Sequence, residues 1–589
     1  MCGIIGILKI NGSEETVAEL VSSLKKMDYR GYDSWGYAVI NDNALKIEKK
    51  AGRITKGTLH EKTFIGVGHT RWATHGGVTD ENAHPHTDCK NEIAIVHNGI
   101  IDNYLELKKE LEEKGHIFKS ATDTETIAHL FEEADGNLLE KAKKVVKKLK
   151  GSFAITTIDK KNPNEMVAIK HESPLIIGKG KDRIIFASDP LAFLEYTQKA
   201  YFVEENEIVF ARRNDAIVEL EFYNFVEGKK VKRELKELDW KAESAELNWY
   251  SHYMLKEINE QPSALRHCIN VENAQKVADE IKGKKVVAVA CGTARHASVI
   301  GKHLLHKIAK FPIEVMMAHE FSYFVDDAPE DTLILAVSQS GETADVLEVV
   351  RKAKRRGLPI ISIVNVISST LARESKIVFP LNCGPEIAVA STKAFTNMVL
   401  AFYLISYSLV GKLKEVKENM SSIISILEKQ LPYFDKKARE IAKYLKNKKH
   451  AYLLGKGVNL AMALEGSLKL KEISYIHAEG MPAGELKHGT LALIENGTPV
   501  VLLCPTDYTY NDCISNGLET KARGAYLIGI SDKNHPSFDQ WVELPQIDEE
   551  IFYPLLEAIP LQLIAYYTAV LLGKDVDKPR NLAKSCTVK

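Results

Sequence analysis

The 589-residue sequence lacks paired cysteines, an excess of charge of either sign, and a basic segment ahead of its first apolar run. Its eight cysteines form no C-x-x-C pair and no ligand-like spacing. They therefore predict reduced thiols in a cytoplasmic protein, and neither a disulfide framework nor a zinc site. A formal net charge of −1 predicts no attraction to nucleic acid or to an anionic membrane. The missing basic segment argues against a signal peptide.

Long uninterrupted hydrophobic runs are also scarce. The apolar stretch 398–410 is too short to cross a bilayer, and the stretch 551–572 contains Pro554, Glu557 and Pro560. Both are predicted to be buried helices or helices at a subunit interface, which favours a homodimer. No G-x-G-x-x-G or Walker pattern stands between a strand and a helix, so no nucleotide cosubstrate is expected, and no other cofactor.

The chain is too long for one hydrophobic core, so several domains are expected. Short β-rich runs dominate residues 2–235, with helices predicted at about 103–114 and 123–133, a pattern typical of stacked antiparallel sheets with helices outside them. Residues 236–262 are charged and aromatic, and they predict an ordered linker because tryptophans are uncommon in disordered ones.

The remainder of the chain contains a repeat. Apolar runs at 286–291, 333–337 and 361–364 recur at 451–454, 500–504 and 526–530, with offsets of 165, 167 and 165 residues. Alternation of such runs with helices predicts parallel sheets, and the regular offset indicates duplicated domains. We expect them at 263–430 and 431–575, followed by a C-terminal catalytic tail at 576–589.

Cys2 is the first candidate for catalysis. Removal of Met1 would leave its α-amine free beside its own thiol. An α-amine titrates near pH ~8, so part of it is neutral at pH 7 and accepts the thiol proton directly or through water. Cysteine also occurs at this position by chance, so the hypothesis depends on the polar clusters that follow.

Hydrolysis of an amide explains why such clusters would converge on one thiol. Asn98 and the Gly99 amide are suited to an oxyanion hole, Arg71 to a substrate carboxylate, and Asp123 to an α-ammonium group. Taken alone, Asn98-Gly99 also fits a β-turn and Asp123 a helix N-cap. The four histidines between residues 69 and 86 have no chelating spacing, so no metal site is predicted.

The first domain resembles the class II glutamine amidotransferases, which are N-terminal-nucleophile hydrolases. The motifs are Cys2-Gly-Ile-Ile-Gly, Arg30-Gly-Tyr-Asp-Ser, Thr70-Arg-Trp-Ala-Thr-His-Gly, Ala83-His-Pro-His, His97-Asn-Gly and Thr122-Asp-Thr-Glu. The resemblance implies an αββα sandwich with glutaminase activity and Cys2 as the nucleophile. It implies an oxyanion hole at Asn98 and Gly99, and a glutamine site formed by Arg71, Thr74, His75, Gly99 and Asp123. The chain departs from the family at Trp35, where small residues are usual.

Two hydroxyl clusters begin predicted helices in the second half. Ser338-Gln339-Ser340-Gly341-Glu342-Thr343 follows a buried strand, and Ser391-Thr392-Lys393 follows a short apolar segment. Hydroxyls and free N–H groups at a helix N-terminus suit a phosphate monoester, although helix capping alone also accounts for them.

Ionisable residues gather further along. Glu465, Lys469 and Glu472 share one face of a predicted helix, either as functional groups or as a surface salt-bridge ladder. His488 lies in a Gly-bounded loop, and Lys584 lies in the polar tail. Such tails are usually frayed, but the proline and the Leu-Ala pair of this one predict docking.

These motifs resemble the paired sugar-isomerase (SIS) domains of the glutamine–fructose-6-phosphate aminotransferase family, and with the first domain the resemblance runs end to end. It implies two doubly wound parallel-sheet SIS domains after the αββα sandwich. The implied reaction moves ammonia from L-glutamine through an internal channel to fructose 6-phosphate, yielding glucosamine 6-phosphate and glutamate. The implied site residues are Ser338, Gln339, Ser340 and Thr343 for phosphate, Thr293, Val389 and Ser391 for the sugar, and Trp72 as channel gate.

The chemistry fits those implied roles. Histidine is the usual acid–base residue near neutral pH, so His488 suits ring opening, and the Lys584 amine can form a Schiff base with the ketone. Glu472 would move a proton between C1 and C2, positioned by Lys469 and Glu465.

Two departures from the family bear on the substrate: Ala294, where serine is usual, and Thr490, where proline is usual. Losing one hydroxyl contact shifts preference by roughly 1–2 kcal/mol. A glutamine-dependent aminotransferase for another ketose phosphate is therefore an alternative, and a non-catalytic sugar-phosphate sensor is a second one. The sensor would leave Cys2 without a role.

Overall fold

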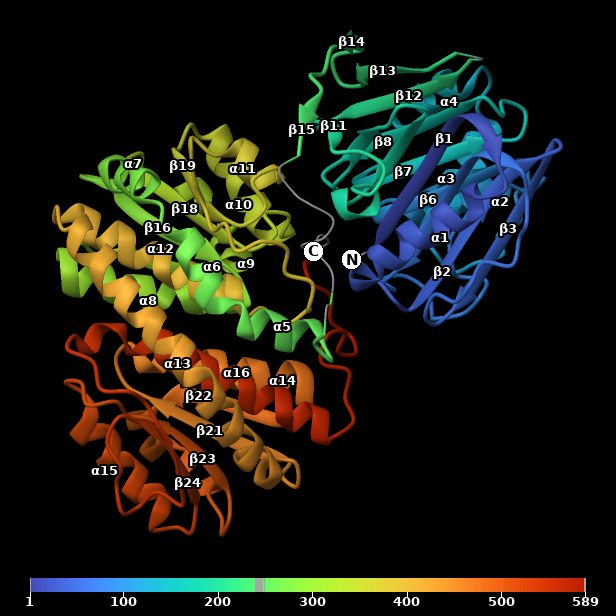
Figure 1. Ribbon diagram of the computed structural model, residues 1–589. Coiled ribbons are helices and arrows are strands. Elements are labelled where there is room, and N and C mark those ends of the chain that lie inside the picture. The colour runs from blue at the N-terminus through green and yellow to red at the C-terminus, as the bar shows by residue number, and fades with distance from the viewer. Residues whose placement is uncertain (1, 215, 239–246, 248, 587–589) are drawn as a thin grey trace. The chain divides into compact units, whose positions relative to one another are not determined.

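The computed structural model describes residues 2–214, 216–238, 247 and 249–586. The chain divides into two compact units (Figure 1): Met1–Glu246 with Ser585–Lys589, and Leu247–Lys584.

Two antiparallel sheets form the first unit. In spatial order, the first sheet consists of β15 (Lys236–Glu237), β11 (Lys199–Phe202), β9 (Ile176–Lys179), β10 (Arg183–Ala187), β1 (Gly3–Ser13), β4 (Thr63–Arg71), β2 (Ser34–Asn41) and β3 (Ala44–Ala51). The second sheet consists of β14 (Lys229–Val231), β13 (Val218–Asn224), β12 (Glu207–Arg213), β8 (Glu165–His171), β7 (Gly151–Asp159), β6 (Ile93–Ile101) and β5 (His86–Thr87).

Alternation along the strands assigns side chains to layers. In β1, Ile4 and Leu8 enter the core between the two sheets, whereas Ile5 and Ile7 face α1 (Thr16–Lys26) on the other side. The outer face of the second sheet is covered by α2 (Tyr104–Glu113), α3 (Thr124–Glu133) and α4 (Leu138–Val145). These layers confirm the predicted αββα sandwich, and Trp35 is buried in the α1 layer.

The second unit contains two five-stranded parallel sheets. The first has the order β17 (Glu314–Met317), β16 (Lys285–Ala290), β18 (Thr332–Ser338), β19 (Ile360–Val364), β20 (Ile377–Pro380). The second has the order β22 (His477–Pro482), β21 (His450–Gly455), β23 (Pro499–Leu503), β24 (Tyr526–Ser531), β25 (Gln540–Glu543). Relative to chain order the two sheets have the same strand order, so the predicted repeat and parallel-sheet architecture are confirmed.

Helices cover both sheets. They include α8 (Gly292–Ala309), α10 (Ala344–Arg355), α12 (Lys393–Leu409), α13 (Leu413–Leu445), α14 (Asn459–Ser474), α15 (Tyr510–Lys521) and α16 (Tyr553–Leu571). Most of them share one large core, whereas α10 and α15 pack in two separate smaller cores. The two apolar stretches belong to α12 and α16, whose side chains are almost all buried, as predicted. By length and composition the segment Glu550–Leu571 could cross a membrane, but 89% of its most apolar window is buried inside the protein.

The expected linker is described only in part. Residues 239–246 and 248, which include Trp240, lie outside the described residues. Trp249 and Tyr250 stack with ring centroids 3.9 Å apart. The following α5 (Tyr253–Asn259) and α6 (Gln261–Cys268) place Met254 and Leu265 in the core of the second unit.

Candidate active sites

Cys2 lies directly before β1, and its thiol contacts the residue that follows β4. The Trp72 amide donates a hydrogen bond to the Cys2 Sγ at 3.2 Å, and the thiol lies 3.5 Å from the Trp72 carbonyl oxygen. The Cys2 carbonyl oxygen accepts hydrogen bonds from the Asn98 Nδ2 at 3.0 Å and the Arg30 Nε at 3.2 Å. The thiol is thus held against the protein and is half-buried.

Arg71 organises the loop beside this thiol. Its guanidinium donates to the carbonyl oxygens of His75, Gly76 (3.2 Å) and Gly77 (3.1 Å). Burial lowers the pKa of Arg71, and Cys2 and Asp123 are near enough to act on its charge in the opposite direction. The predicted carboxylate-binding cation therefore lies next to the predicted nucleophile.

Asp123 does not cap its own helix with its side chain, although it stands at the N-cap position of α3. Its Oδ2 instead accepts the Ile101 amide of β6 at 2.8 Å. The N-cap alternative for this side chain is therefore wrong, and the carboxylate is fixed between α3 and the strand that carries Asn98.

Asn98 and Gly99 lie inside β6, so the β-turn alternative is wrong as well. Gly99 has φ +126°, and a Cβ there would come within 1.9 Å of the Ser152 carbonyl oxygen, so only glycine fits. His69 orients Asn98. Burial lowers the pKa of His69 to about 3, and its Nε2 lies 3.1 Å from the Asn98 Oδ1. A neutral ring donating to that oxygen leaves the Asn98 amide hydrogens directed at Cys2.

The remaining histidines pack against the start of α3. His84 stacks on His69 at 4.1 Å, and its Nε2 lies 3.0 Å from the Thr124 Oγ1. The His97 Nδ1 lies 2.9 Å from the same oxygen, and burial lowers the pKa of His84 and His97. These neutral rings connect β4, β6 and α3, a supporting role that the sequence motifs did not reveal.

Thr74 and His75 lie in the loop after β4. Thr74 is exposed, and the His75 ring packs edge-on against Tyr104 at 5.2 Å.

In the second unit, the α14 residues form a buried charge cluster. Lys469 Nζ lies 2.6 Å from the Glu472 Oε2 and 3.3 Å from the Glu465 Oε1. Glu465 and Lys469 are 2% and 1% exposed, so the surface-ladder alternative is wrong. Although burial alone would lower the pKa of Lys469, the two carboxylates hold it above its usual value.

Thr293, at the start of α8, joins this cluster to the first of the two parallel sheets. Its hydroxyl donates to the Glu465 Oε1 and accepts from the Lys469 Nζ, both at 3.1 Å. The His296 Nδ1, one turn further along α8, lies 2.8 Å from the Glu465 Oε2. Thr293, which is expected to contact the sugar, therefore contacts Glu465 and Lys469, which are expected to position Glu472, across the two repeats.

The predicted phosphate loop connects β18 to α10. The Ser338 Oγ lies 3.1 Å from the Thr343 Oγ1 and accepts the Gly341 amide at 3.0 Å. The Ser340 Oγ accepts the Glu342 amide at 3.2 Å. Thr343 makes no side-chain cap to its helix, so capping does not account for its hydroxyl. Hydroxyl groups and the N-terminus of α10 thus gather in one turn.

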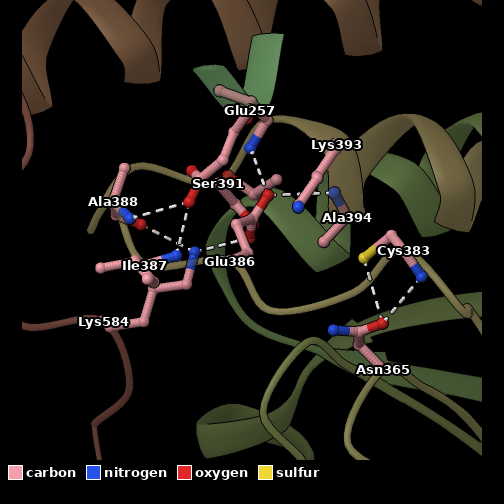
Figure 2. A network of polar contacts seen from close by, with 12 residues as sticks. Glu257, Asn365, Cys383, Glu386, Ile387, Ala388, Ser391, Lys393, Ala394 and Lys584 are labelled. Carbon is pink, nitrogen blue, oxygen red and sulfur yellow. Dashed lines mark hydrogen bonds and ion pairs between the residues drawn. The ribbon is translucent and has the colours of Figure 1, made fainter. Parts of the chain in front are cut away.

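Lys584 is anchored in a network that Figure 2 shows. Its Nζ lies 2.5 Å from the Glu386 Oε2 and donates to the Ala388 carbonyl oxygen at 2.8 Å. The Ser391 hydroxyl donates to the same Glu386 oxygen at 2.6 Å. Burial alone would raise the pKa of Glu386. The charge of Lys584 and the hydrogen bonds that Lys584 and Ser391 donate lower this pKa to about 2. The predicted docking of the tail is confirmed through Lys584.

Further contacts connect this network to the phosphate loop. The Asn365 amide donates to the Gln339 carbonyl oxygen at 3.2 Å, and the Asn365 side chain donates to the Gly384 carbonyl oxygen at 2.8 Å. The Val389 amide donates to the Asp577 carbonyl oxygen at 2.9 Å.

Sequence reasoning missed Glu386, which follows a proline in a segment without a recognisable pattern.

His488 is placed differently from the other predicted sugar-site residues. It ends the short helix η5 (Ala483–His488) and is exposed. Within the described part of the chain, no hydrogen bond or ion pair connects it to Glu472 or Lys584. Ala294 is buried in α8, and Thr490 begins η6 (Thr490–Leu493).

Both halves of the chain match family models. The SIS domain model matches residues 281–408 and 444–572, and the glutamine amidotransferase domain model matches residues 69–195. A glutamine–fructose-6-phosphate aminotransferase (isomerizing) from Thermococcus kodakarensis is 42% identical over 610 residues, covering 100% of both chains. The chain belongs to the glutamine–fructose-6-phosphate aminotransferase family. The resemblance predicted from its motifs is confirmed.

Other members of the family agree. The aminotransferase of the same name from Aquifex aeolicus is 43% identical over 603 residues, again with 100% of both chains covered. A solved C-terminal domain of glucosamine-fructose-6-phosphate aminotransferase from Francisella tularensis is 37% identical, with a TM-score of 0.53, and covers 57% of this chain and 100% of that chain.

Proposed function

We propose that this member of the family transfers the amide nitrogen of L-glutamine to D-fructose 6-phosphate and isomerises the product to D-glucosamine 6-phosphate, releasing L-glutamate. The observation that carries the proposal is the presence of two separate sets of reactive groups in one chain. In the first unit, the side-chain amide of Asn98 donates to the carbonyl oxygen of Cys2, whose thiol lies against Trp72, and a buried lysine–carboxylate pair lies in the second unit.

In the first half-reaction, the α-amine of Cys2 takes the thiol proton and the thiolate attacks the amide carbon of glutamine. Asn98 and the Gly99 N–H stabilise the oxyanion of the tetrahedral intermediate. Ammonia leaves with the transferred proton, and water hydrolyses the thioester to glutamate. Arg71 binds the substrate carboxylate and Asp123 its α-ammonium group. Thr74 and His75 complete this pocket, and Trp72 gates the passage of ammonia.

In the second half-reaction, Ser338, Gln339, Ser340 and Thr343 hold the phosphate at the N-terminus of α10. Thr293, Val389 and Ser391 contact the sugar. His488 assists ring opening, and Lys584 condenses with the C2 ketone, losing water.

The Schiff-base step requires Lys584 to lose a proton, and Glu386 is the carboxylate in contact with it. Ammonia then attacks C2 and expels the lysine amine, which leaves fructosimine. Glu472 removes a proton from C1 and returns one to C2, which gives the aldose. Lys469 and Glu465 hold Glu472 in place.

We propose domain boundaries that assign the two half-reactions to separate domains. Residues 2–235 form the glutaminase domain, 236–262 a linker, 263–430 and 431–575 the two SIS domains, and 576–589 a catalytic tail. We propose that the protein acts in the cytoplasm as a homodimer, as the first enzyme of hexosamine synthesis, without nucleic acid or membrane partners.

The test is to incubate the purified chain with glutamine and fructose 6-phosphate and to identify the product. Glucosamine 6-phosphate is expected. Cys2→Ala should abolish glutamine hydrolysis but keep fructose 6-phosphate binding, whereas Lys584→Ala should keep glutamine hydrolysis and lose borohydride trapping of the ketose. Retained glutaminase turnover in Cys2→Ala, or trapping in Lys584→Ala, would contradict these roles.

The same experiment separates the alternatives. Ala294, beside the Thr293 contact, is the observation that favours another ketose phosphate as acceptor. Turnover with such a sugar, and none with fructose 6-phosphate, would support that alternative. Sugar-phosphate binding without any glutamine hydrolysis would support a sensor.

A further inference from the structure

Four potential metal ligands meet in the first unit, at α3 and at two loops beside it. They come from the loop before β6, from the loop between α2 and α3, and from α3 itself: Cys89, His116, His129 and Glu132. We call them the Cys89 cluster. One ligand atom from each lies within 4.8 Å of all the others. None of these residues has a role in the proposed chemistry.

The distances within the cluster match those between the ligands of one tetrahedral ion. Zinc with Zn–S of about 2.3 Å and Zn–N or Zn–O of about 2.0 Å would hold S and N about 3.5 Å apart and N and O about 3.3 Å apart. The Cys89 Sγ lies 3.5 Å from the His116 Nδ1 and 3.6 Å from the His129 Nδ1. The Glu132 Oε2 lies 3.2 Å and 3.4 Å from those two nitrogens.

Hydrogen bonds with neighbouring groups orient the ligand atoms of His116 and Glu132 toward the centre of the cluster. The His116 Nε2 lies 3.0 Å from the Glu133 Oε1, and this carboxylate favours the hydrogen on Nε2 and the lone pair on Nδ1. The Cys89 amide donates to the Glu132 Oε2 at 3.1 Å, which orients the fourth ligand. A carboxylate-backed histidine is the arrangement that metal-binding imidazoles commonly have.

When the His116 ring is neutral, hydrogen bonding alone does not satisfy this geometry well, whereas a doubly protonated ring would donate to both Glu132 and Glu133. With the His116 hydrogen on Nε2, the lone pair of Nδ1 faces a carboxylate oxygen at 3.2 Å, so two acceptors oppose each other. The single thiol hydrogen of Cys89 can serve only one of two imidazole nitrogens. For neutral rings, a metal cation at the centre of the cluster resolves both conflicts.

We propose that the Cys89 cluster binds one zinc ion as a closed structural site. One thiolate, two imidazoles and one carboxylate fill all four positions, so no position stays open for substrate. The ion would join two loops to α3, the helix that begins at Thr124, directly after Asp123. It would therefore stabilise the helix that presents Asp123 to glutamine. This proposal revises the expectation that the cysteines take no part in a zinc site.

The decisive measurement is the metal content of the full-length protein, expressed with zinc in the medium and purified without chelators. We expect about one zinc per chain, and less than about a tenth of that in Cys89→Ala and in His116→Ala. The matched control is Cys291→Ala, which removes another half-buried cysteine that lies near a histidine and an aspartate, His319 and Asp345. This control should keep its zinc.

The wild-type protein gives an independent readout if the variants do not fold. After removal of zinc and addition of Co²⁺, a tetrahedral site with a thiolate ligand shows strong ligand-field absorption and thiolate-to-cobalt charge transfer. Removal of zinc should also lower the Tm, and ZnCl₂ should restore it.

Three outcomes would overturn the proposal: wild-type protein without zinc after incubation with ZnCl₂, loss of zinc only in Cys291→Ala, or the weak cobalt spectrum of an octahedral site. None of these outcomes depends on the aminotransferase reaction, so the zinc site and the proposed function can fail separately.

Discussion

The two SIS repeats have the same strand order but different chemistry at the same turn. In the first repeat the turn between β18 and α10 carries the hydroxyls of Ser338, Ser340 and Thr343. In the second repeat, two aspartate side chains accept hydrogen bonds from the backbone amides of the turn between β23 and α15. Asp532 accepts the Thr506 amide at 2.7 Å, and Asp507 accepts the Thr509 amide at 2.7 Å.

A helix N-terminus attracts an anion, and the repeats satisfy this requirement in two ways. The second repeat supplies its own carboxylates beside α15, so an external phosphate would meet like charge there. The first repeat presents neutral hydroxyls at this turn, so a bound ligand would have to supply the negative charge. In return, the second repeat contributes the charged residues of α14. In the function proposed above, the first repeat therefore binds the phosphate and the second contributes the groups for proton transfer.

The largest effect should come from the proposed proton-transfer residue of the second repeat, Glu472. Glu472→Gln should slow formation of glucosamine 6-phosphate by about 10²–10⁴-fold, because an amide cannot carry the proton. The dissociation constant of fructose 6-phosphate should change little. Steady-state product assays and calorimetry measure the two quantities. Glu440→Gln, on the exposed face of α13, is the matched control. A Glu472→Gln rate close to wild type would remove Glu472 from the proton transfer.

Next in size is a change that makes the first repeat resemble the second. Ser340→Asp places a carboxylate in the phosphate loop, and we expect the dissociation constant of fructose 6-phosphate to rise about 100-fold through like-charge repulsion. Ser340→Asn separates the effect of charge from that of size and should cost far less. Equal losses in the two variants would show that charge does not distinguish the repeats.

A smaller effect is expected from removing one hydroxyl. Ser338→Ala should weaken binding of fructose 6-phosphate about tenfold, since a hydrogen bond to a charged group contributes roughly 1.5–3 kcal/mol and the neighbouring donors compensate in part. Glutamine hydrolysis measured without sugar should be unchanged. Unaltered sugar-phosphate affinity would place the phosphate elsewhere.

The smallest effect should be found in the second repeat. Asp532→Asn removes the charge that holds the Thr506 amide, and the free energy of unfolding should fall by about 1 kcal/mol, as for the weakening of one hydrogen bond to a charged group. Urea unfolding of the full chain measures it. The affinity for fructose 6-phosphate should stay within about twofold, because we propose that the phosphate binds at the first turn and distant sites act independently. A large loss of affinity would mean that both turns contact the ligand.

Much of the architecture could be predicted from local patterns. The strand alternation that separates Ile4 from Ile5, the helix face shared by Glu465 and Lys469, and the repeat offset all follow from periodicity. Motif resemblance indicated Cys2, Asn98 and Lys584. Local patterns did not separate a capping Asp123 from one bonded to β6, because both place the residue before the same helix.

The sequence by itself determined the two fold classes, the duplication and the chemical identity of most reactive groups, since these depend on residue type and short-range period. Only the tertiary structure decided which polar groups are buried together. Glu386 contacts Lys584, 198 residues away in the sequence, and Cys89 lies beside three potential metal ligands from two other segments. Such meetings depend on how strands and loops return to the same place, and burial there fixes the charge that each group carries.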